Sequence, residues 1–305
     1  MIGKICGTGS SIPVKIMDND DLSNIVDTND AWIRERTGVE KRHIAESEST
    51  VSMAVEAGRK ALAQTGIRPE ELDMIVVSTM SPDAVLPCTA CEVQKAIGAE
   101  GAVCFDLQAA CTGFIFAYNT AQAYIQSNMC RTVLLIGSER LSRLVDWTDR
   151  GTCILFGDGA GAAVLKAAEG RAYLPVSHSD GKKGEALTCD RYIHMDGRAV
   201  FQFAVTRVPE VIREILTKNE LIMDDVDYFV LHQANRRIVE AVAKRLRQPI
   251  EKFPMNLQEY GNTSSASIPI LLDEMNRSGK LKKGQKLVVA GFGAGLSWGA
   301  SIVEW

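Results

Sequence analysis

Short apolar runs alternate with helix-forming stretches along nearly the whole chain, and this alternation restricts the fold more than any other feature. The sequence predicts strands at residues 2–7, 74–78, 103–107, 132–136, 160–165, 228–231, 287–290 and 300–304. It predicts helices at residues 49–65, 90–97, from the turn at Cys111 to about 127, 205–218, 235–246 and 268–277. Short apolar strands with helices between them are typical of an α/β protein with mostly parallel sheets covered on both faces.

The size and composition of the chain fit one large domain or two of ordinary size. It has 305 residues, of which 46% are hydrophobic and 24% charged, as in ordinary globular proteins. The strand–helix rhythm begins again after residue 168, so the sequence predicts two halves, 1–168 and 169–305. The apolar runs are too short to span a membrane and no secretory signal is visible, so we expect a cytoplasmic protein.

The cysteines and the net charge argue against several classes of protein. Eight cysteines are too few for a disulfide scaffold in a chain of this length, so we expect free thiols. Cys88 and Cys91 have the spacing of a redox or metal pair, but no second pair follows, and we expect no metal site. A net charge of −4 disfavours nucleic-acid binding. Cations outnumber acids between residues 231 and 252, which indicates either a solvated helix face or a docking surface for an acidic partner.

Cys111 is the cysteine best placed for chemistry. It lies in a turn between the strand predicted at 103–107 and a largely apolar helix, where Gly113 permits a tight backbone. The positive end of that helix stabilises a thiolate by at most ~2 kcal/mol, or about 1.5 pKa units. From an ordinary pKa of about 8.5, this predicts that the pKa of the Cys111 thiol lies close to neutral pH. The thiol would then be reactive at pH 7 without a partner base. A purely packed thiol describes the other cysteines better.

His232 and Asn262 are the candidates to act with Cys111. His232 directly follows the strand predicted at 228–231, so we expect it at the carboxyl edge of a sheet, where ligands bind in α/β proteins. Asn262 lies in a Gly-Asn turn, and its carboxamide can donate to a developing oxyanion. Each residue has a structural alternative: a core histidine, and a turn that leads into a helix capped by Ser264 or Ser265.

A glycine-rich segment, residues 291–295, lies between the last two predicted strands. It lacks the Gly-Lys-Ser/Thr of a phosphate loop, and no dinucleotide fingerprint surrounds it. Its other interpretation is a loop that brings backbone amides close to a reacting carbonyl, where a side chain would collide.

Together these motifs resemble the beta-ketoacyl-acyl-carrier-protein synthase III family, condensing enzymes of the thiolase superfamily that initiate fatty acid synthesis. The resemblance covers essentially the whole chain and is carried by residues 27–33, 36–38, 109–114, 156–161, 232–235, 261–264 and 291–299. It implies a homodimer with a thiolase-like, five-layered αβαβα fold built from two similar halves. The first half would carry the nucleophilic cysteine, and the second the histidine and the asparagine. It also implies acyl transfer from acyl-CoA to Cys111, followed by decarboxylative condensation with malonyl-acyl-carrier protein.

The resemblance implies roles for individual residues as well. His232 and Asn262 would promote decarboxylation, and the backbone amides of Cys111 and Ala294 would hold an oxyanion. Positions that bind CoA match Thr28, Trp32, Arg36, Arg150 and Asn235. Positions that dock the acidic carrier protein match Arg237, Lys244 and Arg245. Acyl-CoA is then a substrate, and neither a cofactor nor a metal is implied.

Three residues depart from the family pattern. Leu86 stands where a phenylalanine can wall the acyl pocket across the dimer, so we expect longer or branched primers to fit. Gln202 replaces a lysine of the docking face, and Ala294 replaces the usual glycine. Two alternatives stay open: a related acyltransferase or condensing enzyme of secondary metabolism, and a non-catalytic scaffold that binds carrier protein. The intact Cys-His-Asn set disfavours the scaffold, because packing alone does not require these three residues.

Overall fold

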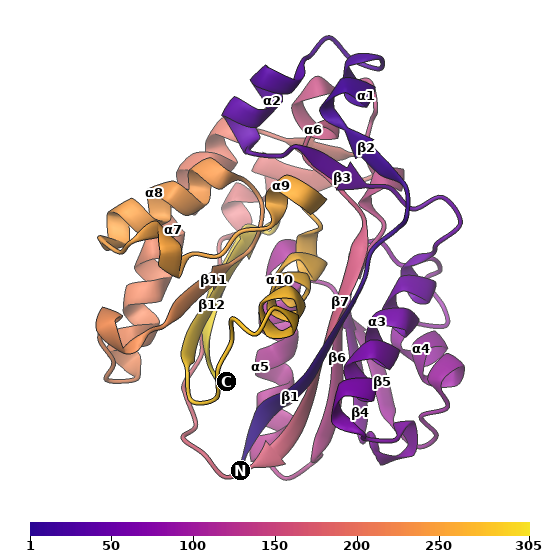
Figure 1. The fold of residues 1–305 in the computed structure, drawn as a ribbon, viewed down its shortest axis with the longest axis vertical. Helices are drawn as coiled ribbons and strands as arrows, with labels where there is room; N and C mark the ends of the chain where they lie inside the picture. The colour runs from indigo at the N-terminus through magenta and orange to yellow at the C-terminus, as the bar shows by residue number, and fades with distance from the viewer.

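A computed structural model describes all residues from Met1 to Trp305, and most of its strands form two sheets (Figure 1). The first sheet has the order β1-β7-β6-β4-β5 and consists of β1 (Ile2–Ser11), β4 (Met74–Ser78), β5 (Val103–Leu107), β6 (Thr132–Glu139) and β7 (Gly159–Ala168). The second has the order β11-β12-β13-β8 and consists of β8 (Val176–Ser179), β11 (Tyr228–Leu231), β12 (Lys286–Gly293) and β13 (Ser297–Glu304). Two short ribbons pair β2 (Ile16–Asp18) with β3 (Lys41–His43), and β9 (Leu187–Cys189) with β10 (Ile193–Met195).

Ten α-helices cover the sheets or connect their strands. They are α1 (Asn19–Ser23), α2 (Asp30–Thr37), α3 (Thr50–Thr65), α4 (Thr89–Ile97), α5 (Gly113–Gln126), α6 (Arg150–Cys153), α7 (Gly197–Lys218), α8 (Arg236–Leu246), α9 (Leu257–Tyr260) and α10 (Ser267–Arg277). Two short 3-10 turns matter for the site: η2 (Ala110–Thr112) precedes α5, and η7 (Ser264–Ala266) precedes α10.

The helices and sheets are stacked in five layers (Figure 1). Helices α3 and α4 pack on the outer face of the first sheet, and α7 and α8 on the outer face of the second. Helices α5 and α10 lie between the two sheets and contact both. The five-layered αβαβα architecture that the resemblance implies is therefore confirmed.

The central strands β4 and β6 of the first sheet are buried on both faces, which explains their mostly apolar sequences. In β6, Val133 and Leu135 pack into the central core around α5 and α10. Leu134 and Ile136 point the other way, into the core beneath α3 and α4. Alternate residues of one strand thus support two different hydrophobic cores.

The expectation of mostly parallel sheets is wrong, because both sheets are mixed. Strand β4 is parallel to β5 and β6, and β11 is parallel to β12. Strand β7 runs antiparallel to β1 and β6, and β13 runs antiparallel to β12 and β8. A short turn joins β12 to β13, and such a turn permits only antiparallel pairing. A strand buried on both faces has the same apolar pattern in either direction, so the sequence did not distinguish the two.

Most predicted helices and strands are present, with shifted ends. The helix expected at 205–218 begins at Gly197, where the Asp196 carboxylate accepts hydrogen bonds from two backbone N–H groups of the first turn. Strand β12 continues to Gly293, so the first part of the glycine-rich segment is strand rather than loop. All strands of the first sheet end by Ala168, and those of the second begin at Val176. The division into domains at 168/169 stays a prediction.

All eight cysteines are free thiols, as expected. The Sγ atoms of Cys88 and Cys91 lie 3.4 Å apart without a disulfide bond. No group of three or more His, Cys, Asp or Glu side chains is arranged to hold a metal ion. Among the helices, none has both the length and the apolar character needed to cross a bilayer.

Candidate active site

A cavity of about 220 Å³ opens between the two halves of the fold and is lined mainly by apolar side chains. Cys111, His232 and Asn262 all line it, so the structure brings together three residues that lie far apart in the sequence. The rest of its wall includes Met80, Leu141, Leu155, Phe156, Ile193, Met195, Val200, Phe201, Ile238 and Phe292. A mostly apolar cavity with a few polar groups is the usual form of a small-molecule site.

The turn that presents Cys111 is tighter than the sequence indicated. Ala110 has a left-handed backbone with φ 44°, a conformation that costs a non-glycine residue energy and often marks a functional site. Gly113 has φ −56°, so the expectation that it permits the turn is wrong. A Cβ atom on Gly113 would lie 1.9 Å from Ser78 Oγ. A glycine is needed at position 113 because α5 approaches the end of β4 closely.

The prediction of a Cys111 pKa close to neutrality is also wrong. Burial raises the pKa of Cys111 to about 12; the Ser264 hydroxyl lowers it and the Glu139 carboxyl raises it by smaller amounts. Desolvation can shift a pKa by up to about 3–5 units, more than a helix terminus contributes. The thiol is therefore protonated in the free protein, and its proton must leave during an attack on substrate.

His232 is held as a neutral imidazole at the end of β11. Its side chain is buried, and burial lowers the pKa of His232 to about 3. Nδ1 lies 2.8 Å from Ser267 Oγ, and the ring packs edge-on against Phe292 at 5.5 Å between centroids. A hydroxyl can donate to Nδ1 or accept from it, so Ser267 accommodates either neutral tautomer. Nε2 has no partner in the protein and is the nitrogen left for a substrate.

Asn262 is fixed by its backbone and by one side-chain atom. Its N–H donates to the Leu155 carbonyl at 2.8 Å, and its Oδ1 accepts the Ser264 N–H at 2.8 Å. Because Oδ1 is occupied and Nδ2 has no partner, the two amide hydrogens are free to donate. The helix cap considered at Ser264 or Ser265 is wrong, since α10 begins at Ser267 and neither hydroxyl caps it.

Two backbone N–H groups beside the cavity are also unpaired. The N–H groups of Cys111 and Ala294 donate to no acceptor in the protein, and both residues line the cavity. Ala294 is not among the residues with positive φ, so the replacement of glycine by alanine meets no backbone strain there. A Cβ atom on Gly293 would lie 3.0 Å from the Cys111 backbone nitrogen, so the glycine-rich segment does approach the cysteine closely.

Three of the five residues matched to CoA-binding positions line the cavity, and a fourth, Arg150, stacks on one of them. Arg36 and Arg150 lie on the Trp32 ring, with their guanidinium carbons 4.8 and 4.9 Å from its centroid. Trp32, Arg36 and Asn235 line the cavity, whereas Arg150 and Thr28 do not. Asn235 Nδ2 donates to the Arg36 carbonyl at 3.0 Å and joins α8 to α2. The buried Thr28 hydroxyl has no hydrogen-bond partner.

The residues matched to docking positions are exposed beside the cavity. Helix α8 begins directly after Asn235, and Arg237, Lys244 and Arg245 are exposed along it. None of the three cations forms an ion pair within the chain, so all are available to an acidic partner. Leu86 lies outside this chain's own cavity and is 82% exposed.

Sequence reasoning missed two side chains that shape the site, Ser267 and Phe292. Ser267 contacts His232 across 35 residues of sequence, and no pattern along the chain links the two. Phe292 lies within the glycine-rich segment, and the pattern of that segment indicates a role for its backbone rather than for this side chain. The spacing of His232 after an apolar strand predicts its position, but not its neighbours.

Comparison with known proteins places these features in context. Residues 105–181 match the family described as 3-oxoacyl-[acyl-carrier-protein (ACP)] synthase III, and residues 216–305 match its C-terminal part. Beta-ketoacyl-[acyl-carrier-protein] synthase III of Clostridium novyi is 46% identical, over 99% of this chain and 98% of the relative. The crystal structure of 3-oxoacyl-[acyl-carrier-protein] synthase III from Aquifex aeolicus is 44% identical, covers 99% of this chain and 100% of its own, and superposes with a TM-score of 0.97. The priming beta-ketosynthase of the R1128 polyketide pathway is 36% identical, over 99% of this chain and 96% of its own, with a TM-score of 0.95.

Proposed function

The chain belongs to the beta-ketoacyl-acyl-carrier-protein synthase III family, and from that membership we propose how its cavity carries out the family's reaction. The protein is an acyltransferase that condenses an acyl-CoA primer with malonyl-acyl-carrier protein and thereby initiates fatty acid synthesis. The assignment of individual steps to individual residues is our proposal. It rests on one observation above all: the thiol, the imidazole, the carboxamide and two unpaired backbone N–H groups line the same cavity.

In the first step Cys111 takes the acyl group. Its sulfur attacks the thioester carbonyl of acyl-CoA, the bond from that carbon to the CoA sulfur breaks, and the thiol proton ends on the departing CoA thiol. The carbonyl oxygen becomes negative in the tetrahedral intermediate, and the N–H groups of Cys111 and Ala294 stabilise it. Because the proton leaves with CoA, no side chain has to retain it.

In the second step malonyl-acyl-carrier protein loses CO2. The carbon–carbon bond to its carboxylate breaks, and the electron pair forms an enolate whose oxygen needs hydrogen-bond donors. Neutral His232, with its proton on Nε2, and Asn262 Nδ2 supply them in a dry cavity, where such bonds are strongest. The enolate carbon then attacks the acyl group on Cys111, the thiolate leaves as 3-oxoacyl-acyl-carrier protein forms, and a proton taken up from solvent restores the thiol. These steps use only side chains and backbone groups of the chain, so we propose that no cofactor is needed and that acyl-CoA enters as substrate.

We also propose that the protein works in the cytoplasm as a homodimer. Strand β5 lies at an open edge of the first sheet, with Val103 58% exposed on it. Val85 and Leu86, in the loop after β4, are 88% and 82% exposed, an unusual state for two adjacent large apolar residues. A second copy that pairs along β5 would cover the edge and bury both side chains.

The proposed function is tested by a condensation assay with malonyl-acyl-carrier protein and a panel of acyl-CoA primers. We expect 3-oxoacyl product and CO2, with branched or longer primers used at least as well as acetyl-CoA, because Leu86 is smaller than phenylalanine. Leu86→Phe should shift kcat/KM toward acetyl-CoA by about tenfold, in line with the cost of one or two buried methylenes. Strict preference of the wild type for acetyl-CoA would contradict the role of Leu86. Product only with an acceptor other than carrier protein would favour the enzyme of secondary metabolism.

The docking face makes a separate prediction. Charge reversal by Arg237→Glu or Lys244→Glu should raise the KM for malonyl-acyl-carrier protein about three- to tenfold, because surface charges steer an acidic partner. The KM for acyl-CoA should stay unchanged. Lys283→Glu is the matched control, since Lys283 is also exposed but precedes β12, at the opposite end of that strand from Gly293 and the cavity. Equal effects on both substrates would count against a surface specific for carrier protein.

A further inference from the structure

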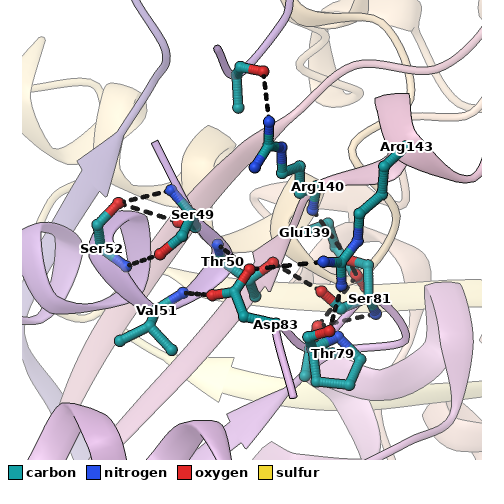
Figure 2. Close-up of polar contacts among 12 residues, drawn as sticks. Ser49, Thr50, Val51, Ser52, Thr79, Ser81, Asp83, Glu139, Arg140 and Arg143 are labelled. Atoms are coloured by element: carbon teal, nitrogen blue, oxygen red, sulfur yellow. Dashed lines mark hydrogen bonds and ion pairs between the residues drawn. The ribbon is translucent and has the colours of Figure 1, made fainter. Parts of the chain in front are cut away.

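Glu139, the last residue of β6, is a fully buried carboxyl group that does not line the cavity. One of its oxygens, Oε2, accepts hydrogen bonds from the Ser81 hydroxyl at 2.6 Å and the Thr79 hydroxyl at 3.3 Å (Figure 2). The same oxygen accepts the Met80 N–H at 3.1 Å. All three donors belong to the segment after β4, residues 79–87, which carries Leu86 and is called the Leu86 loop below. Glu139 therefore anchors the start of that loop.

The middle of the Leu86 loop is anchored separately (Figure 2). The Asp83 carboxylate accepts the N–H groups of Thr50 and Val51 at 3.2 and 2.8 Å and so caps α3. It also pairs with Arg143 at 3.6 Å. The loop is thus fixed on both sides of Pro82 before it reaches its exposed apolar tip.

The other oxygen of Glu139 faces the loop of Asn262, residues 261–266, called the Asn262 loop below. Oε1 lies 2.7 Å from Ser265 Oγ, and the same hydroxyl lies 2.9 Å from the Ser78 carbonyl oxygen. A serine hydroxyl has one proton, and a carbonyl can only accept. If Ser265 donates to Ser78, its contact with Glu139 is a hydrogen bond only when Oε1 carries a proton and donates. A neutral carboxylic acid satisfies both contacts, since Oε1 then donates its proton to Ser265 while Ser265 donates to the Ser78 carbonyl.

The surroundings of Glu139 agree with a neutral form. No lysine, arginine or histidine pairs with it, and burial raises the pKa of Glu139 while the Ser81 and Ser265 hydroxyls lower it by less. The titratable group that it faces is the Cys111 thiol, whose pKa the ionised form of the carboxyl raises. The neighbouring Arg140 guanidinium points elsewhere, to the carbonyls of Ala45 and Glu46 at 3.2 and 3.3 Å.

We propose that protonated Glu139 is a positioning residue that hydrogen-bonds to both the Leu86 loop and the Asn262 loop and so fixes their positions relative to each other and to Cys111. Asn262 Oδ1 is itself held by the Ser264 N–H, so a shift of Ser265 moves the donor that the enolate needs. The kinetic part of this inference rests on the proposed function. The protonation state of Glu139 does not, and the two parts are tested separately.

The first experiment compares the wild type with Glu139→Gln in urea unfolding at pH 5, 6, 7 and 8. The glutamine amide can donate to Ser265 and accept from the Leu86 loop, so it copies the protonated acid. An acid whose pKa is raised on folding binds more protons in the folded state, so the wild type loses stability as pH rises above the unfolded pKa of about 4.3. The unfolding constant of the wild type, divided by that of Glu139→Gln, should rise with pH by up to about tenfold per pH unit. The rise should stop when the pH reaches the pKa of Glu139 in the folded protein. Glu100→Gln, at an exposed glutamate without an ion pair, should give a constant ratio. A constant ratio for Glu139→Gln would overturn the proposal.

The second experiment measures the two half-reactions at pH 7. Glu139→Gln should keep Cys111 acylation and condensation within a few-fold of wild type. Glu139→Ala and Ser265→Ala should lower kcat for condensation by about a hundredfold, the scale of a small misplacement, with little change in the KM for acyl-CoA. Equal losses in the glutamine and alanine variants would overturn the positioning role. If the wild type itself failed to condense, the proposed function would be wrong, while the urea experiment would still decide the protonation of Glu139.

Discussion

Cys111→Ala should abolish the covalent acyl adduct that forms when the protein is incubated with acyl-CoA. Loss of the nucleophile from a catalytic set costs about 10⁴- to 10⁶-fold, and condensation should fall by at least the lower figure. The expected result is a single acyl mass increment on the wild type and none on the variant, measured by intact-protein mass spectrometry. An alanine also removes the buried thiol without adding a polar group, so the fold should survive.

Cys189→Ser is the matched control for that experiment. Cys189 lines the same cavity but is exposed, and nothing in the proposed reaction uses it. The control should keep both the adduct and the condensation rate. An adduct that persists in Cys111→Ala and disappears in Cys189→Ser would identify Cys189 as the nucleophile and contradict the proposed site.

The raised pKa of Cys111 adds a pH dependence to the same prediction. With a pKa of about 12, the thiolate fraction grows about tenfold per pH unit throughout the neutral and mildly alkaline range. Alkylation of Cys111 by iodoacetamide should therefore keep rising from pH 7 to pH 10. A plateau near pH 8 would mean that the helix terminus outweighs burial, as the sequence alone suggested.

The alternation of apolar runs with helix-forming stretches was sufficient to predict sheets covered by helices, whereas the five-layered arrangement was implied only by the family resemblance. The pattern places Val133 and Leu134 of β6 on opposite faces, and both faces are indeed buried. Strand direction was not predictable in this way, because direction depends on connections that leave no mark in a strand's own residues. The turn at Ala294 makes β12 and β13 antiparallel, and the glycine-rich pattern predicts only a loop there.

The three candidate catalytic residues were predictable for different reasons. Cys111 and His232 each follow an apolar strand, and the carboxyl ends of strands gather in one region of an α/β fold. Asn262 had a structural alternative, and only the family resemblance distinguished its role. The pKa of Cys111 was the least predictable property of the site, because it depends on burial by residues distant in sequence. The partners of Ser265 are likewise unpredictable, because Glu139 is contributed by a strand of the other half.

His232→Ala and Asn262→Ala should separate the two half-reactions. Neither side chain has to retain a proton during acyl transfer, so the rate of Cys111 acylation should fall by less than about tenfold. Decarboxylation of malonyl-acyl-carrier protein should fall by about 10²- to 10³-fold in each variant, the usual cost of one oxyanion donor. Release of ¹⁴CO2 from labelled malonyl-carrier protein, beside the mass increment on Cys111, measures the two rates independently. His178→Ala is a control, since that histidine is bonded to Glu214 outside the cavity and should leave both rates unchanged.

The charge state of His232 adds a second way to distinguish decarboxylation from acylation. Because burial lowers its pKa to about 3, the imidazole is neutral throughout pH 5–9, and decarboxylation should show no loss from protonation of His232 as the pH falls to 5. Asn262→Asp keeps the shape of the side chain but removes both amide donors and adds an acceptor beside the enolate. It should lose decarboxylation at least as completely as Asn262→Ala, while acylation survives. If both alanine variants folded and failed to acylate, His232 and Asn262 would belong to the first step, and the division of the reaction between the thiol and the two donors would be wrong.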